Sequence, residues 1–180
     1  MKTPDHPTAS SGLEPILADL TERFGARIEA VQPARPNEVY CHARMELVAG
    51  FCAQLYKKWN GRLVSLFADD ARSEAVVFHL YYVFALDAAH GFLVLRVPVP
   101  PEQARFTSLT DALPAANWQE REVQDLFGLE LDGHPNPRRC ALHDDWPRVY
   151  PLRKDFVEPQ EYHGISTVRE SPIIRLDQKH

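Results

Sequence analysis

The sequence predicts an α+β fold: a mostly antiparallel sheet with helices packed on one side, followed by an extended proline-rich C-terminal arm. Two observations predict the sheet domain, since amphipathic helical segments precede three strand-like runs and short connectors join those runs. A third predicts the arm, because ten of the fifteen prolines lie beyond residue 97. We therefore expect a disordered leader over 1–10, an α+β domain over 11–132 and the arm over 133–180.

Two helices are expected in the first part of the chain. Residues 13–24 (LEPILADLTERF) carry apolar side chains at the i, i+3, i+4, i+7 spacing, with Ser11 as the expected N-cap and Gly25 at the end. Residues 45–59 repeat this spacing and stop at an Asn-Gly pair. Cys52 lies on the apolar stripe of the second helix, so core packing explains it better than reactivity.

Strand-like runs accompany these helices. A short run over 28–31 is followed by prolines, and three longer runs, 62–68, 75–86 and 91–99, are rich in Val, Leu, Phe and Tyr. Their connectors have hairpin length, which requires antiparallel neighbours, because a parallel pair needs a crossover of about a dozen residues or more. The run 75–86 lacks polar alternation, as expected of a central strand covered on both faces, and its His79 is expected to be a core histidine.

A last helix is expected over 118–127, with Asn117 as N-cap and Glu120 at position N3. Within two turns it carries three carboxylates and one guanidinium, those of Glu120, Arg121, Glu122 and Asp125. Three interpretations stay open. The charges form a partner interface or a buried ion network, or an Arg121–Asp125 i,i+4 pair with acids favoured at the helix N-terminus, or a pair of catalytic carboxylates that lacks a nearby His or nucleophile.

The arm is charged, aromatic and interrupted by prolines. Because proline fixes φ and has no N–H, the arm cannot satisfy its backbone in regular structure, and we expect a docking strap that partner proteins order. Its candidate contact residues are His134, Arg138, Arg139, Trp146, Arg153, Lys154 and Asp155. Arginine suits bidentate contacts to carboxylates, so the basic pairs are expected to meet partner or intrachain carboxylates, with solvated surface or phosphate as alternatives. His134, between Gly133 and Pro135, is most simply a turn residue whose ring packs or hydrogen-bonds.

Composition and spacing argue against several function classes. A net charge of −5 disfavours nucleic acid as a partner. Three widely spaced cysteines without a CxxC predict no metal centre, no iron–sulfur cluster and no cofactor held by this chain alone. Gly128 and Gly133 have the spacing of a phosphate loop, but His-Pro follows where Lys-Ser/Thr is required. The apolar run 75–86 is short of the ~20 residues that span a membrane, and the N-terminus has no apolar signal region.

Three segments carry a resemblance to a known family. They are PAANWQEREVQDLFG (114–128), DGHPNPRR (132–139) and YPLRKDF (150–156). They resemble the signature of the 30 kDa subunit of NADH-quinone oxidoreductase, the respiratory complex I. The same module occurs in membrane-bound nickel–iron hydrogenases of the formate hydrogenlyase type. Complex I sequences tend to read Gly-His-Pro-Leu-Arg-Lys-Asp in the last segment, whereas Val149-Tyr150 stand before the proline here, which favours the hydrogenase branch.

The resemblance implies a structural and assembly subunit with no redox role and no catalytic residues of its own. Its expected partners are the large subunit, which borders the quinone site in complex I or carries nickel–iron in hydrogenases, and the iron–sulfur subunits. It would be cytoplasmic and peripheral to the cell membrane through the complex, without direct membrane insertion. A rival from another class is an independent binding domain whose arm folds back on its own sheet. Whether the parent complex is a quinone oxidoreductase or a hydrogenase stays open.

Overall fold

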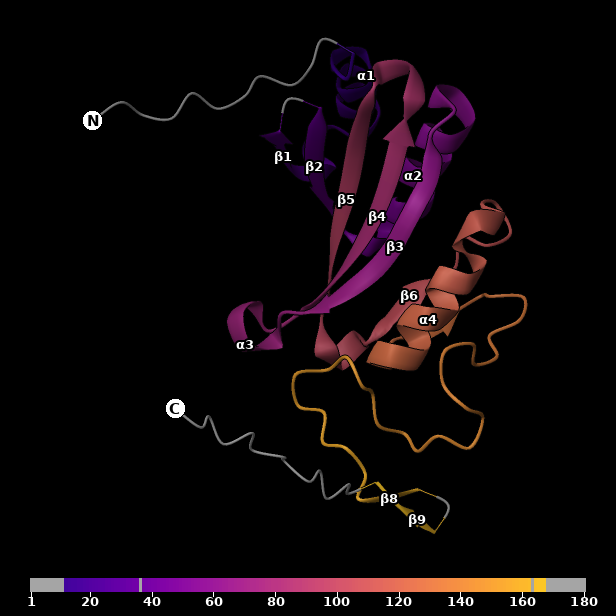
Figure 1. Ribbon diagram of the computed structural model, residues 1–180. Coiled ribbons are helices and arrows are strands. Elements are labelled where there is room, and N and C mark those ends of the chain that lie inside the picture. The colour runs from indigo at the N-terminus through magenta and orange to yellow at the C-terminus, as the bar shows by residue number, and fades with distance from the viewer. Residues whose placement is uncertain (1–11, 36, 163, 168–180) are drawn as a thin grey trace, which may run out of the picture.

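The computed structural model describes residues 12–35, 37–162 and 164–167 (Figure 1). The expected leader over 1–10, Ser11 as the first N-cap and the last residues of the expected arm lie outside the described residues. Within the described part of the chain, helix α1 starts after Leu13, which makes no side-chain capping hydrogen bond.

A five-stranded sheet with the strand order β1-β2-β5-β4-β3 forms the centre of the fold. The strands are β1 (Ile28–Arg35), β2 (Glu38–Ala43), β3 (Arg62–Asp70), β4 (Phe78–Leu86) and β5 (Gly91–Val99). Helices α1 (Glu14–Phe24) and α2 (Met45–Trp59) precede β3, β4 and β5, which are antiparallel neighbours as predicted. Figure 1 shows α2 behind the sheet. The predicted α+β class is confirmed.

Shorter elements complete the described chain. The helical ones are η1 (Gly25–Arg27), α3 (Arg72–Ala75), η2 (Asp87–Ala89), η3 (Pro101–Gln103), η4 (Pro114–Ala116) and α4 (Asn117–Phe127). The extended ones are β6 (Arg105–Thr107), β7 (Glu130–Asp132), β8 (Glu161–Tyr162) and β9 (Ile165–Ser166). Strand β6 precedes α4 in the sequence and β7 follows it, and the two strands form a small parallel pair. Residues 133–160 contain no helix or strand, as the proline content predicts.

Strand β2 is an addition that the sequence does not predict. It pairs in parallel with β5, from Glu38 opposite Phe92 to His42 opposite Arg96. The connector rule applies only to successive runs, and α2, β3 and β4 lie between β2 and β5 in the chain. The sheet is therefore mostly, but not wholly, antiparallel.

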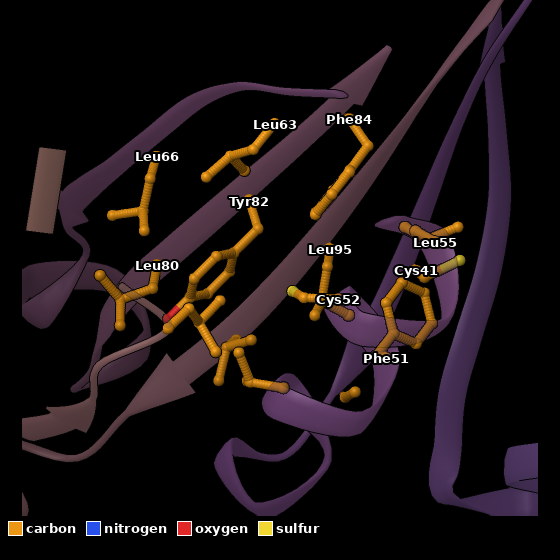
Figure 2. Packing of buried hydrophobic residues seen from close by; sticks show 14 of the residues in the cluster. Cys41, Phe51, Cys52, Leu55, Leu63, Leu66, Leu80, Tyr82, Phe84 and Leu95 are labelled. Atoms are coloured by element: carbon orange, nitrogen blue, oxygen red, sulfur yellow. The ribbon is translucent and has the colours of Figure 1, made fainter. Parts of the chain in front are cut away.

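The hydrophobic core lies between the sheet and the helices. Figure 2 shows Tyr82 and Phe84 of β4 turned to the same interior as Phe51 and Cys52 of α2. Burial raises the pKa of the Cys52 thiol well above its ordinary value, so the group stays a neutral packed side chain. The expected packing role of Cys52 is confirmed.

Strand β4 differs from its expectation in two ways. It begins at Phe78 rather than at 75, because the preceding residues form α3 and Val76 takes a left-handed conformation with φ 56°. It is an inner strand paired with β3 and β5, as expected, but its outer face is not fully covered, since Tyr81 and Val83 there are partly exposed. His79 is buried as expected, but on this outer face, where desolvation and the nearby Arg96 lower its pKa.

The start of α4 also differs from its expectation. Asn117 is the first helical residue, and Ala116 is the N-cap without a side-chain hydrogen bond. The 3₁₀ turn η4 leads directly into the helix, so Asn117 already has α-helical dihedrals (φ −44°, ψ −60°) and cannot act as a cap. The end agrees with the sequence, because Gly128 closes the helix in the left-handed conformation.

Candidate partner interface at the junction of helix α4 and the arm

Helix α4 buries three charged side chains. Glu120, Arg121 and Asp125 are 0%, 8% and 4% exposed. A buried charge is costly unless it is paired or hydrogen-bonded, so each of these side chains must have partners nearby. Figure 1 shows α4 close to β3, β6 and the looping arm that follows it. The partners come from these segments.

Glu120 faces the segment after β6. Its carboxylate accepts hydrogen bonds from the Ser108 hydroxyl (2.6 Å), the Leu109 N–H (2.6 Å) and the Thr110 hydroxyl (2.8 Å). The Nε2 atom of buried His134 lies 3.9 Å from the same carboxylate. Glu120 therefore fixes the turn between β6 and α4 and faces the first turn of the arm.

His134 is a buried turn residue, as the sequence predicts. Its Nδ1 accepts a hydrogen bond from the Asn136 N–H at 3.0 Å, which closes a local turn at the start of the arm. Because Nδ1 is the acceptor, the proton of the neutral ring is assigned to Nε2, the atom that faces Glu120.

Arg121 and Gln124 hold the next stretch of the arm by its carbonyl groups. The Arg121 Nε donates to the Arg138 carbonyl at 2.6 Å, and its Nη2 donates to the Arg139 carbonyl at 2.9 Å. The Gln124 amide donates to the Pro137 carbonyl at 2.9 Å. The guanidinium of Arg121 also lies 4.6 Å from the ring centroid of Trp118, a cation–π contact.

Asp125 holds the following residues by their N–H groups. Its Oδ2 accepts from the amides of Cys140 (2.8 Å), Ala141 (2.9 Å) and Leu142 (3.3 Å). The Arg121–Asp125 i,i+4 pair, one of the three interpretations left open, does not form, because both side chains turn to the arm backbone. One face of α4 thus supplies the donors and acceptors that regular structure would have given to residues 137–142.

A second attachment joins the arm to the C-terminal end of α4. The Arg153 Nε donates to the Phe127 carbonyl at 2.6 Å, one of the carbonyls that a helix end leaves without an internal partner. The Tyr150 ring lies over Gly128 so closely that a Cβ there would come within 2.3 Å of its Cζ. The guanidinium of Arg153 lies 4.4 Å from the centroid of that ring.

A third attachment reaches the end of β3. The buried carboxylate of Asp70 accepts from the Lys154 N–H at 2.9 Å and from the Arg72 Nη2 at 2.7 Å. Arg72 in turn donates to Asp155 at 2.7 Å. The hydrogen bond from Arg72 holds the pKa of Asp70 well below its ordinary value, so Asp70 stays ionised at neutral pH.

The side chains of the other expected contact residues take no part in these attachments. Glu122 and Arg138 are exposed, and the Lys154 ammonium reaches exposed Ser73 and Glu74, each at 3.4 Å. The indole N–H of Trp146 donates to the Val149 carbonyl at 3.1 Å. The arm was expected to become ordered only when partner proteins bind, but its described residues already contact their own domain.

Several residues at this junction carry no signal in the sequence. Asp70 and Arg72 lie in an ordinary strand connector, and their arm partners follow more than 80 positions later, at Lys154 and Asp155. Gln124 is similarly a common surface residue on a helix. Trp118 is 66% exposed, an exposure that the helical pattern alone does not require. The signals that marked this region were the charge density of α4, the proline-rich arm with its basic pairs and the three family-like motifs.

The described residues hold neither a clustered metal site nor a membrane-spanning helix. No group of three or more His, Cys, Asp or Glu side chains there could hold a metal ion. None of the helices in the described ranges combines the length and the apolar character needed to cross a membrane. The expected lack of a cofactor stays a prediction.

Comparison with known proteins decides the family. A family model described as the respiratory-chain NADH dehydrogenase 30 kDa subunit matches residues 42–162, which include most of the sheet, all of α4 and the attached arm. The chain belongs to this family. The resemblance seen in the sequence motifs of α4 and the arm is therefore confirmed.

Relatives within and around the 30 kDa subunit family come from two kinds of assembly. Hydrogenase-4 component G of Escherichia coli is 33% identical over 84% of this chain and 28% of its own length. Formate hydrogenlyase subunit 5 of the same organism is 38% identical over 65% of this chain and 21% of its own length. An NADH-quinone oxidoreductase subunit of Salinispora tropica is 34% identical over 82% of this chain and 62% of its own length. The chain spans about a quarter of the length of the two hydrogenase relatives.

Two solved structures share the fold of this 30 kDa subunit family member. A trypsin-resistant fragment of Nqo5 matches with a TM-score of 0.60 and 23% identity, over 69% of this chain and 98% of the fragment. A chain of the membrane-bound sulfane sulfur reductase, an archaeal respiratory membrane complex, matches with a TM-score of 0.70 and 22% identity, over 80% of this chain and 85% of that chain. At these identities the likeness shows the fold alone.

Proposed function

We propose that this chain is a non-redox docking subunit of a complex-I-like oxidoreductase, placed against the large subunit that borders the quinone site. The observation that carries the proposal is the family match over 42–162, because it includes the α4–arm junction as well as the sheet. Iron–sulfur subunits are its other proposed neighbours. Association with the membrane would be peripheral and would come through these partners.

The geometry of the junction supports a docking role. Three attachments fix an irregular segment that has no secondary structure of its own, at a considerable cost in conformational entropy. A pre-ordered arm loses less entropy when a partner binds, so its association is stronger for the same contacts. Trp118 lies beside the ordered segment and is 66% exposed, and tryptophan is among the residue types that dominate the energy of protein interfaces.

A hydrogenase is the second candidate for the parent complex. The 33% and 38% identities to Hydrogenase-4 component G and Formate hydrogenlyase subunit 5 favour it. The residues Val149-Tyr150 before the last motif favour it as well. In that case the docking role is the same, and the large partner carries nickel–iron instead of bordering a quinone site.

An independent binding domain is the rival from another class, and it too accounts for an arm that folds on its own domain. The two proposals differ in whether the chain has permanent partner subunits. A chromosomal affinity tag on this chain, mild detergent extraction and mass spectrometry of the co-purifying proteins test the difference. We expect a large subunit and iron–sulfur subunits in constant ratio. Recovery of the chain alone, from cells that express the whole gene cluster, would contradict the docking role.

The same preparation separates the two parent complexes. NADH-dependent reduction of a quinone analogue by the purified complex indicates a quinone oxidoreductase. Hydrogen-dependent reduction of a viologen dye, together with bound nickel, indicates a hydrogenase. Neither activity is expected from the isolated chain.

A further inference from the structure

A groove of about 460 Å³ lies between the C-terminal half of α4 and the arm. It is lined by Gln124, Asp125, Gly128, Leu129, Glu130, Arg139, Arg148 and Tyr150. Two carboxylates and two guanidinium groups thus share one groove. Whether it attracts an acid or a base depends on which of these charges already have partners.

Both carboxylates of the groove are already in use. Asp125 accepts three arm amides through Oδ2, those of Cys140, Ala141 and Leu142. Glu130 accepts a hydrogen bond from Arg105, which lies outside the groove, at 3.1 Å. One oxygen atom of each carboxylate, Oδ2 of Asp125 and Oε2 of Glu130, is therefore already occupied by intrachain donors.

Neither guanidinium group has a carboxylate within hydrogen-bond distance among the described residues, and Arg139 has only a long ion pair with Asp125. The nearest carboxylate oxygen to the Arg139 Nε is Oδ1 of Asp125, at 4.0 Å, which is too long for a hydrogen bond. The Arg139 Nη1 is buried, with no hydrogen-bond partner among the described residues. Arg148 is exposed and forms no hydrogen bond or ion pair with the part of the chain that the structure describes. A buried donor without an acceptor is costly, so this groove favours an incoming anion.

We propose that this groove receives an acidic segment of a partner subunit, with an Asp or Glu carboxylate between Arg139 and Arg148. The inference rests on the docking function proposed above and names the chemistry of the contact. Arginine binds carboxylates through two parallel N–H donors, and two arginines on one groove suit a single carboxylate. The volume exceeds what one carboxylate fills, so a stretch of partner backbone would occupy the remainder. Buried Leu129 forms an apolar part of the wall for such a stretch.

The first test converts proximity into a covalent bond. Arg148→Lys places a primary amine in the groove, and a water-soluble carbodiimide joins an amine to a carboxylate only when the two are in ion-pair contact. Treatment of the tagged complex, followed by mass spectrometry, should give an amide link from position 148 to an Asp or Glu of another subunit. Arg138→Lys, an exposed arm position outside the groove, is the matched control and should give at least about tenfold less of any such link.

The second test measures binding directly. Arg148→Gln should speed loss of the partner from the immobilised complex about tenfold or more and reduce its salt dependence, because a charge pair at an interface acts mainly on dissociation. Arg138→Gln should leave both unchanged. Since Arg148 forms no hydrogen bond or ion pair with the described residues, the variant should fold as the wild type does, which thermal melts of the isolated chain would check.

The outcomes separate the groove from the docking function. If the wild-type chain co-purifies with no partner, the docking function fails and the groove inference with it. If the complex forms but Arg148→Lys links only to a carboxylate of this same chain, or Arg148→Gln leaves dissociation unchanged, the groove inference alone is overturned. A stabilising effect of 50 mM succinate on the isolated chain, without any cross-link, would assign the groove to a small anion instead.

Discussion

At the scale of single residues, the charged side chains of α4 form the hydrogen bonds with the arm backbone that a helix or sheet would otherwise provide. Arg121 and Asp125 supply donors and acceptors to the arm backbone, and each hydrogen bond to an ionised group contributes about 1.5–3 kcal/mol. Charge density in a sequence is therefore an ambiguous signal. It left a partner interface, a buried ion network and plain helix electrostatics open here, and the structure gives the buried charges intrachain partners.

Replacing Asp125 with alanine tests this use of a buried charge. Asp125→Ala leaves the amides of Cys140, Ala141 and Leu142 without their acceptor, and we expect a loss of about 2–4 kcal/mol in the free energy of unfolding. Glu122→Ala, at an exposed position on the same helix, should change it by no more than about 0.5 kcal/mol. Urea unfolding of the isolated chain measures both. Equal effects would mean that the arm backbone does not depend on Asp125.

The carboxylate of Asp70 makes one arm attachment dependent on pH. Its hydrogen bond from Arg72 lowers its pKa below the ordinary 3.8, so ionised Asp70 stabilises the folded chain at every pH above that value. As the pH falls below about 4, the unfolded state takes up the proton first and this stabilisation is lost. The difference in unfolding free energy between wild type and Asp70→Asn should be constant from about pH 5 to 8 and shrink below about 4.

The same titration on Asp111→Asn is the control for Asp70. Asp111 is exposed, so its variant should differ little from wild type at any pH. If the gap for Asp70→Asn instead widens as the pH falls, the carboxylate of Asp70 is not ionised in the folded chain.

At the scale of elements, the C-terminus of α4 packs directly against the arm. Gly128 ends the helix with φ +65°, and the Tyr150 ring packs where a side chain at that position would lie. Glycine is thus required twice, for the backbone conformation and for the space. The helix end and the arm are consequently one packed unit.

Two alanine substitutions separate the cost of the left-handed backbone conformation from the cost of the steric clash. Gly133→Ala meets only the conformational penalty, since φ is +78° and no atom lies within 4 Å of the added Cβ, and should cost about 1 kcal/mol. Gly128→Ala adds the clash with Tyr150, and should cost about 2–4 kcal/mol. In a Tyr150→Ala background the cost of Gly128→Ala should fall to about 1 kcal/mol. Equal costs in both backgrounds would show that the ring can move away from Gly128.

Local periodicity explains which elements the sequence could predict. Helices α1, α2 and α4 and the strands β3, β4 and β5 follow from apolar spacing and connector length, because both signals lie within a few residues. The apolar spacing does not predict strand β2, which is defined by its pairing with the distant strand β5. It also does not predict α3, which ends at the left-handed residue Val76. The arm attachments pair side chains with backbone groups far along the chain, as Lys154 with Asp70, and no periodic pattern records such contacts.

At the scale of the whole molecule, one sheet domain carries an arm that is irregular in backbone but specific in its attachments. The three attachments lie at α4, at Gly128 and at Asp70, so the arm crosses the domain surface from the helix to the end of β3. The relatives of this family include a hydrogenase component and an NADH-quinone oxidoreductase subunit.

Hydrogen exchange of the chain alone and in the purified complex tests most directly that the domain orders the arm before a partner binds. The amides of Cys140, Ala141 and Lys154 should exchange far more slowly than an unfolded chain in the isolated protein, and Asp125→Ala should abolish the protection of the first two. Assembly should add protection around Arg148 and Tyr150. Exchange of the arm amides at unfolded rates in the isolated chain, with protection only in the complex, would contradict the account. It would mean that partner subunits, and not the domain, order the arm.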